Sequence, residues 1–224
     1  MSKLDTFAHL TNFELLTVIV NYGQGSKVLK IAKEQGVKGG TLLMAKGSYK
    51  KPILQFLELT DVRKEIVWMI IPHQLVNKTM HALDDKFRFD KPNHGILFVI
   101  PISSFLGLGD YSLDKIDFSG GNEMTTYNAI FTIVDKGNAE EVVHVATHAG
   151  AKGATIINAR GSGIHETSKL FNMEVEQEKE IVLILAEHSI LKDIVSSIRE
   201  NFNIDEPGKG IIFVQEVHQT MGIR

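Results

Sequence analysis

The chain contains the same sequence pattern twice, and this repeat limits what it can fold into. Residues 36–48, GVKGGTLLMAKGS, return at 150–162 as GAKGATIINARGS; KEIV at 64–67 returns at 179–182; and DKPNHGILFV at 90–99 returns at 205–214 as DEPGKGIIFV. The three segments occur in the same order and at nearly the same spacing in both halves of the chain, which predicts two copies of one domain. We expect domains at 10–104 and 125–224, joined by a glycine-rich surface linker at 105–124.

Composition excludes several classes of protein. The 224 residues carry 24 Lys and Arg against 27 Asp and Glu, so no basic face for nucleic acid is expected. Cysteine is absent, which removes disulfides and thiolate chemistry. No apolar run approaches the roughly 20 residues of a membrane span, and the first residues lack the apolar core of a signal peptide. We therefore expect a cytoplasmic protein with neither nucleic acid nor membrane as its partner.

Hydrophobic spacing predicts the same elements in both copies. Apolar runs indicate strands and three- or four-residue spacing indicates helices. In the second copy the predicted elements are strand 128–134, helix 139–149, strand 154–159, polar loop 161–177, strand 180–186, helix 188–202 with Ser189 as its N-cap, and strand 211–217. This β-α-β-β-α-β order predicts an α+β fold, a tandem repeat of two ferredoxin-like domains. Each domain would have an antiparallel sheet with both helices on one face.

The second copy resembles the PII nitrogen-regulatory signal proteins. Residues 153–163, GATIINARGSG, are similar to the family pattern Gly-x-Thr-Val-x-x-Val-(Lys/Arg)-Gly-x-Gly. The third predicted strand and the segment 208–214, GKGIIFV, are similar to the family's third strand and to its B-loop. The first copy, from 13 to 102, shows the same resemblance more weakly.

The resemblance implies a nucleotide site. In the PII family three subunits form a trimer, and ATP or ADP lies in each cleft between subunits. Carried over, the binding residues would be Gly153, Thr155, Gly161, Gly163, Gly208, Lys209, Gly210 and Arg224, with weaker equivalents Gly39, Thr41, Gly47 and Gly95 in the first copy. Glycine permits close backbone approach, and successive N–H groups can form an anion-binding nest. The pattern departs at Ile211 and Gly222, where the family has a lysine and an arginine.

The loop that starts near 162 takes the place of the family's T-loop, which contacts target proteins. We expect its partner-contacting residues to be Ile164, His165, Lys169, Leu170 and Phe171. The resemblance thus implies a non-enzymatic regulator, a homo-oligomer in which a small effector changes the affinity for a protein target.

Two alternatives stay open. One is a divalent-metal binding or tolerance protein on the same fold, for which His144, His148 and His165 are weak candidate ligands. The other is a structural assembly protein that binds no ligand. An enzyme is not expected, because no activated nucleophile or base is visible in the sequence.

Overall fold

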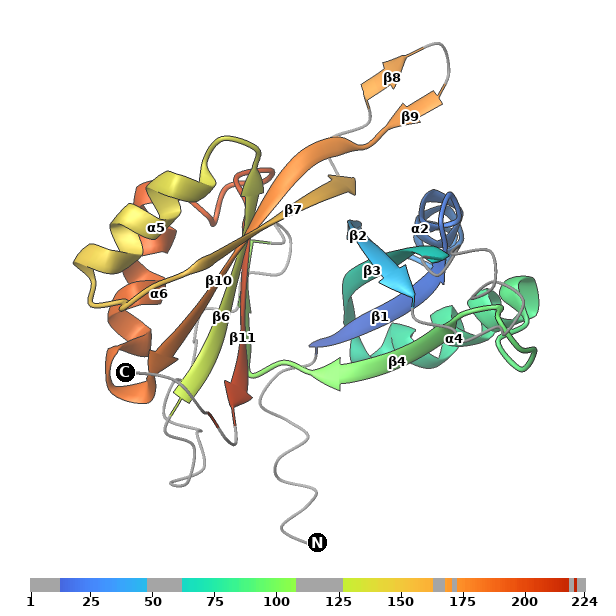
Figure 1. Ribbon diagram of the computed structural model, residues 1–224, viewed down its shortest axis with the longest axis horizontal. Coiled ribbons are helices and arrows are strands. Elements are labelled where there is room, and N and C mark those ends of the chain that lie inside the picture. The colour runs from blue at the N-terminus through green and yellow to red at the C-terminus, as the bar shows by residue number, and fades with distance from the viewer. Residues whose placement is uncertain are drawn as a thin grey trace, which may run out of the picture. The chain divides into compact units, whose positions relative to one another are not determined.

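The computed structural model describes residues 13–47, 62–107, 127–162, 168–170, 173–217 and 220. The chain divides into two compact units (Figure 1). The N-terminal unit is Glu14–Ile100, and the C-terminal unit is Pro101–Arg224 together with the first residues as far as Phe13.

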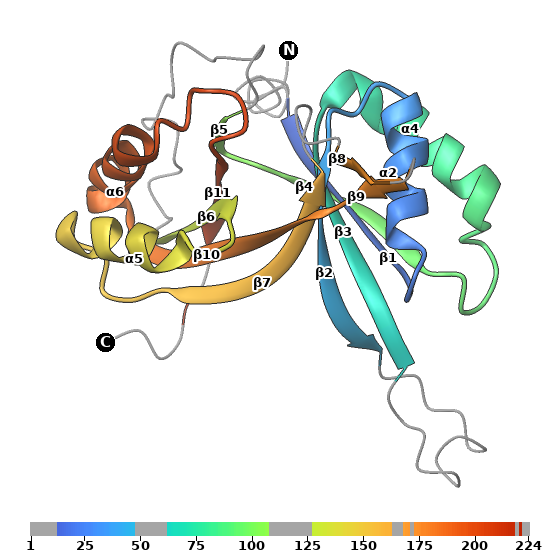
Figure 2. The same cartoon turned by 90° about the horizontal axis from the view of Figure 1, so that it is seen from above.

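The N-terminal unit has four strands and two helices. They are β1 (Phe13–Asn21), α2 (Gly25–Glu34), β2 (Gly40–Gly47), β3 (Val62–Pro72), α4 (His73–Phe87) and β4 (Ile96–Pro101). The strands lie in the order β4-β1-β3-β2. Figure 2 shows α2 and α4 on one face of this sheet. Alternate residues of β1 and β3, such as Leu16, Val18, Val67 and Met69, are fully buried in the core with α2 and α4.

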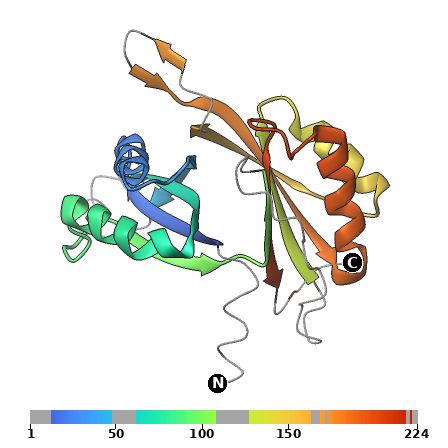
Figure 3. The ribbon, with the colours of Figure 1, turned by 180° about the vertical axis from the view of Figure 1, so that it is seen from behind.

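The C-terminal unit has the same order of main strands and helices, with short strands in addition. Its elements are β5 (Ser104–Leu106), β6 (Tyr127–Asp135), α5 (Ala139–His148), β7 (Thr155–Ser162), β8 (Ser168–Leu170), β9 (Met173–Val175), β10 (Gln177–Glu187), α6 (His188–Phe202) and β11 (Ile211–Val217). The strands of the main sheet are antiparallel in the order β7-β10-β6-β11-β5. Figure 3 shows α5 and α6 on one face of this sheet. The predicted α+β class, antiparallel sheet and placement of the helices are confirmed for this unit.

A glutamate from the central strand binds the start of the first helix in each unit. Glu65 Oε2 accepts a 2.6 Å hydrogen bond from the N–H of Gly25, and Glu180 Oε2 accepts bonds of 2.9 and 3.1 Å from the N–H groups of Gly137 and Ala139. Neither helix has a side-chain hydrogen bond from its own N-cap residue. The first N–H groups of a helix need acceptors, and a negative charge is favoured there. The repeated KEIV segment therefore has a structural role.

Replacing Glu65 with alanine should lower the free energy of unfolding by about 1–3 kcal/mol, because it leaves a buried N–H without its acceptor. Glu65 is 3% exposed. Trp68 in β3 is the single tryptophan, so urea unfolding followed by its fluorescence reports on the N-terminal unit. Glu65→Gln keeps an acceptor oxygen and should lose less. Equal stability of the wild type and Glu65→Ala would contradict this role.

The predicted linker starts too early. Phe105 and Leu106 lie in β5 and pair with Phe213 and Ile212 of β11, and Phe105 is only 2% exposed. An edge strand has unpaired backbone groups, and these two apolar residues cover that edge instead of forming a surface connection. Residues 108–126 lie outside the described part of the chain.

Two local expectations in the C-terminal unit are also corrected. Helix α6 begins at His188 directly after β10, its N-cap is Glu187, and no side chain caps it, so Ser189 has no capping role. The segment predicted as a polar loop contains the short antiparallel hairpin β8–β9.

Candidate functional site

The glycines implied by the resemblance fall into two separate groups in the C-terminal unit. Gly161 ends β7 and pairs with Gln177 at the start of β10, while Gly210 precedes β11, next to the carbonyl of Ile133 near the end of β6. Strands β6 and β7 end, and strands β10 and β11 begin, at the same end of the sheet. Gly161 and the turn at 208–210 therefore both lie at this end of the strands, which is called the Gly161 edge below.

Thr155 lies at the other end of β7. It pairs with Leu183, six residues along β10 from the partner of Gly161, which corresponds to roughly 20 Å at about 3.3 Å per residue. Gly153 and Thr155 are both exposed. One copy of this unit therefore does not bring Thr155 and the Gly161 edge together.

At the turn 208–210, the group available to bind an anion is the side chain of Lys209 rather than a complete nest of backbone N–H groups. Gly208 and Gly210 have φ values of +83° and +142°. The N–H of Lys209 donates to the carbonyl of Glu206 at 3.2 Å, so the turn itself uses it. The Lys209 side chain is exposed.

Other cations at this edge are already paired with carboxylates. Lys179 Nζ is 2.5 Å from Asp135 Oδ1, Lys136 Nζ is 2.9 Å from Glu178 Oε2, and Arg160 Nη1 is 3.7 Å from Glu176 Oε2. Among the described residues, Lys209 has no such partner. It is thus the cation at this edge that can meet an anion without first losing an ion pair.

The weaker equivalents in the N-terminal unit follow the same layout. Gly39 precedes β2, Thr41 lies at its start, Gly47 ends it, and Gly95 precedes β4 with φ +119°. Thr41 is 6% exposed, in contrast to the exposed Thr155. Thr41 therefore does not offer its hydroxyl to solvent as Thr155 does.

The loop residues are described only in part. Lys169 and Leu170 lie in β8. The other expected loop contacts and two expected nucleotide ligands lie outside the described residues: Ile164, His165, Phe171, Gly163 and Arg224.

Two of the three histidines proposed as metal ligands, His144 and His148, have other partners, and His165 lies outside the described residues. His148 Nδ1 donates to the carbonyl of His144 at 2.9 Å, and His144 Nδ1 is 3.7 Å from Glu141 Oε1. Across the described ranges, no group of three or more His, Cys, Asp or Glu side chains is arranged to hold a metal ion. Nor does any helix in those ranges have the length and apolar character needed to cross a membrane.

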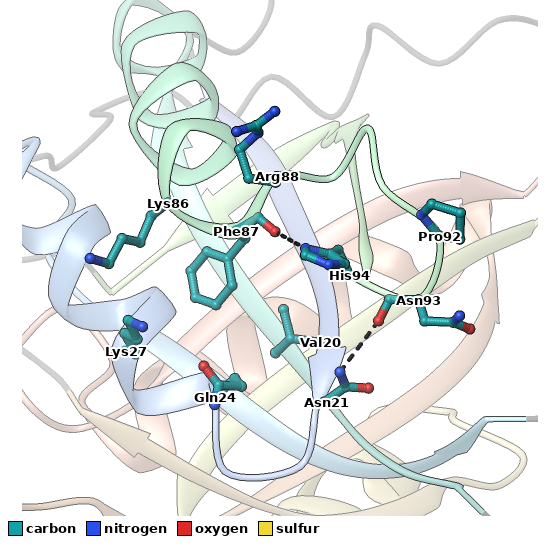
Figure 4. Close-up of a pocket in the computed structure, with 10 residues that line it drawn as sticks. All are labelled: Val20, Asn21, Gln24, Lys27, Lys86, Phe87, Arg88, Pro92, Asn93 and His94. Carbon is teal, nitrogen blue, oxygen red and sulfur yellow. Dashed lines mark hydrogen bonds between the residues drawn. The ribbon is translucent and has the colours of Figure 1, made fainter.

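A pocket of about 380 Å³ in the N-terminal unit was not predicted (Figure 4). Its walls come from the end of β1, the start of α2, the end of α4 and the turn before β4; they are Val20, Asn21, Gln24, Lys27, Lys86, Phe87, Arg88, Pro92, Asn93 and His94. No short motif contains these residues, because they come from separate segments. A comparison of charges between the two sequence copies could have indicated them.

Residues 127–224 match the family model described as nitrogen regulatory protein P-II. The C-terminal domain is thus similar to the P-II family, over less than half of the chain. The predicted resemblance is confirmed for the second copy.

Comparisons of the whole chain add only distant similarities. No curated protein matches it. The crystal structure of Arabidopsis thaliana PII bound to citrate is 19% identical, covering 42% of this chain and 77% of that one, with a TM-score of 0.34. The ligand-free regulatory subunit of Thermus thermophilus aspartate kinase is 12% identical, covering 85% and 93%, with a TM-score of 0.38. At these values, neither similarity supports a functional conclusion.

Proposed function

We propose that this protein is a P-II-like signal protein that binds a small anionic effector, ATP or ADP, and thereby modulates a partner protein in nitrogen metabolism. The match of residues 127–224 to the P-II family carries this proposal. The same family relation is the basis for proposing a cytoplasmic homo-oligomer.

We further propose that the N-terminal unit is a second, diverged P-II-like copy. Its unusual backbone positions support this, because each has a counterpart 114 or 115 residues later. The pairs with positive φ are Gly23 and Gly137, Gly36 and Gly150, Arg88 and Asn203, Asn93 and Gly208, and Gly95 and Gly210. The first helix residues after the central strands also match: His73 Nδ1 bonds Glu14, and His188 Nδ1 bonds Asn128 at 3.1 Å.

The proposed nucleotide site needs two copies of the domain. Thr155 and the Gly161 edge lie at opposite ends of β7, so one of them must come from a second copy to complete a site. This agrees with the cleft between subunits that the resemblance implies. The hairpin β8–β9 extends from the Gly161 edge, so effector binding there would change the ordering of the segment proposed to contact the partner.

Lys209→Ala should weaken ATP binding about tenfold or more, because a charge-assisted contact contributes roughly 1.5–3 kcal/mol and each 1.4 kcal/mol is tenfold. Thr155→Val keeps the side-chain shape and should weaken binding by a smaller factor. Isothermal titration calorimetry with ATP and ADP measures both effects. Lys192→Ala is the matched control, since Lys192 is an exposed lysine near the start of α6, away from the turn at 208–210.

Thermal unfolding of the wild type separates this function from its alternatives. A ligand at about a hundred times its Kd should stabilise the protein by roughly 2.7 kcal/mol. No shift with ATP or ADP would overturn the nucleotide proposal. A shift with Zn²⁺ or Cu²⁺ alone would favour a metal-binding protein, and no shift with any of these, or with 2-oxoglutarate and Mg²⁺, would favour a structural one.

A further inference from the structure

We propose that the pocket of the N-terminal unit binds the phosphate group of a small metabolite, at a site distinct from the nucleotide site proposed for the C-terminal unit. The pocket opens beside the helix layer, between the start of α2 and the end of α4 (Figure 4). It belongs wholly to one unit, so it exists whether or not the chain assembles.

The charge of the lining has one sign. Lys27, Lys86 and Arg88 are among its ten residues, and none of the ten is an aspartate or glutamate. Lys27 Nζ lies 5.6 Å from the centre of the Phe87 ring. Figure 4 shows Lys27 and Lys86 extending on the same side of Phe87. Clustered cations in a concave surface raise the local concentration of anions.

The walls of the pocket are held by hydrogen bonds within the unit. Asn21 Nδ2 donates to the carbonyl of Asn93 at 3.3 Å, and Lys64 Nζ donates to Asn21 Oδ1 at 2.5 Å. In the same pocket, His94 Nδ1 donates to the carbonyl of Phe87 at 2.6 Å. These bonds join the end of β1, the end of α4 and the turn before β4, so the backbone around the pocket is already arranged when a ligand binds.

Helix geometry does not by itself supply this site. The N–H of Gly25 at the start of α2 is already bonded to Glu65. The end of α4 presents carbonyl groups, which favour cations. Attraction for an anion therefore depends on the lysine and arginine side chains.

Comparison with the C-terminal unit argues that these charges serve something other than folding. The apolar positions of the pocket are the same in both units: Val20, Phe87 and Pro92 correspond to Val134, Phe202 and Pro207. The charged positions differ. Lys27 corresponds to Glu141, Lys86 to Asn201, Arg88 to Asn203, Asn21 to Asp135 and His94 to Lys209. At equivalent positions, the N-terminal unit thus has three cations and no carboxylate, whereas the C-terminal unit has one cation and two carboxylates.

A purely structural role explains the presence of Lys86 and Arg88 less well than a binding role does. Lys86 lies in the last turn of α4, where a cation is favoured, and Arg88 Nε is 3.3 Å from Asp90 Oδ1. However, α6 ends in the same left-handed conformation at Asn203 with a different last-turn cation, Arg199, whose Nε is 2.8 Å from Asp205 Oδ2, so the fold does not require cations at the positions of Lys86 and Arg88. An exposed ion pair such as Arg88–Asp90 adds little stability.

The size and walls of the pocket define the ligand class. Its volume of about 380 Å³ is at the lower end of small-molecule sites. Phe87, Val20 and Pro92 provide an apolar surface next to the cations. A phosphorylated compound with a small organic part fits this combination, and inorganic pyrophosphate is a suitable first probe for its anionic part.

The test is calorimetric titration of the full chain with pyrophosphate at low ionic strength. Lys27→Glu combined with Arg88→Asn places the residues of the C-terminal unit in the pocket, and should weaken pyrophosphate binding at least tenfold. The control is Lys33→Glu with Lys78→Asn, which changes net charge equally on the same two helices but outside the pocket. This control should change binding less than twofold. Binding should also shift the NMR signals of the His94 ring.

The outcomes are distinct from those of the nucleotide proposal. Pyrophosphate binding that persists in the pocket variant, or is weakened equally by the control, would overturn the inference, as would an unchanged His94 ring signal. Retained pyrophosphate binding in Lys209→Ala, together with weakened ATP binding, would show two independent sites. A wild type that binds ATP but no pyrophosphate would leave the nucleotide proposal standing and refute this one.

Discussion

Gly95→Ala should lower the free energy of unfolding of the N-terminal unit by about 3 kcal/mol or more. Gly95 has φ +119°, where only glycine is unstrained, and an added Cβ would lie 2.4 Å from the carbonyl oxygen of Ile19 and 3.1 Å from the Phe89 ring. The Ile19 carbonyl belongs to the neighbouring strand β1 and cannot retreat as a flexible side chain could. Urea unfolding followed by Trp68 fluorescence measures the loss.

Gly23→Ala separates the clash from the backbone strain. Gly23 has φ +80°, and an added Cβ there would meet nothing within 4 Å. Only the strain of the left-handed conformation remains, roughly 1–2 kcal/mol. If Gly23→Ala were as costly as Gly95→Ala, the contact with Ile19 would not be the cause.

The repeat made most of the fold predictable because it fixes local geometry as well as sequence. Gly95 and Gly210 were aligned by the matched segments, and both precede a strand with positive φ and face a β1 or β6 carbonyl. The glutamates of the KEIV segments likewise make the same kind of contact. When both copies have the same residue type at an equivalent position, the fold places the same physical requirement on both positions.

Sequence patterns failed where a contact depends on the sheet edge. The three residues of β5 are too few to show an alternating pattern, and their pairing with β11 is determined by an edge that needs a partner. The bounds of α6 were predicted correctly, but its N-cap was not: β10 continues directly into the helix, so the N-cap is Glu187 and not Ser189.

The candidate sites show the same limit. The resemblance named Thr155 and Gly161 together, but the register of β7 and β10 separates them along the strand. Conversely, topology joins Lys27 with Lys86 although 59 positions separate them in sequence. Which residues share a site depends on the sheet order, which spacing along the chain does not contain.

The two copies also differ in what their equivalent edges offer. The C-terminal edge has Lys209 beside cations that are paired with carboxylates, whereas the lining of the N-terminal pocket has three cations, of which Arg88 pairs with Asp90 outside it, and no carboxylate. Two copies that bound one ligand in one way would have no reason for this difference. The proposals therefore assign them different ligands: a nucleotide shared between copies, and a phosphorylated metabolite within one.

Phe213→Ala should destabilise the C-terminal unit by about 3–5 kcal/mol, since it removes a large side chain with no exposed surface. Its ring stacks on Phe131 with centroids 4.7 Å apart and planes at 5°. Hydrogen exchange of the β6 and β11 amides, read by mass spectrometry, measures the loss in this unit. Phe98, the counterpart in the N-terminal unit, is 40% exposed, so Phe98→Ala should cost less than half as much. An equal cost for both would show that burial does not set the energetic weight of this repeated phenylalanine.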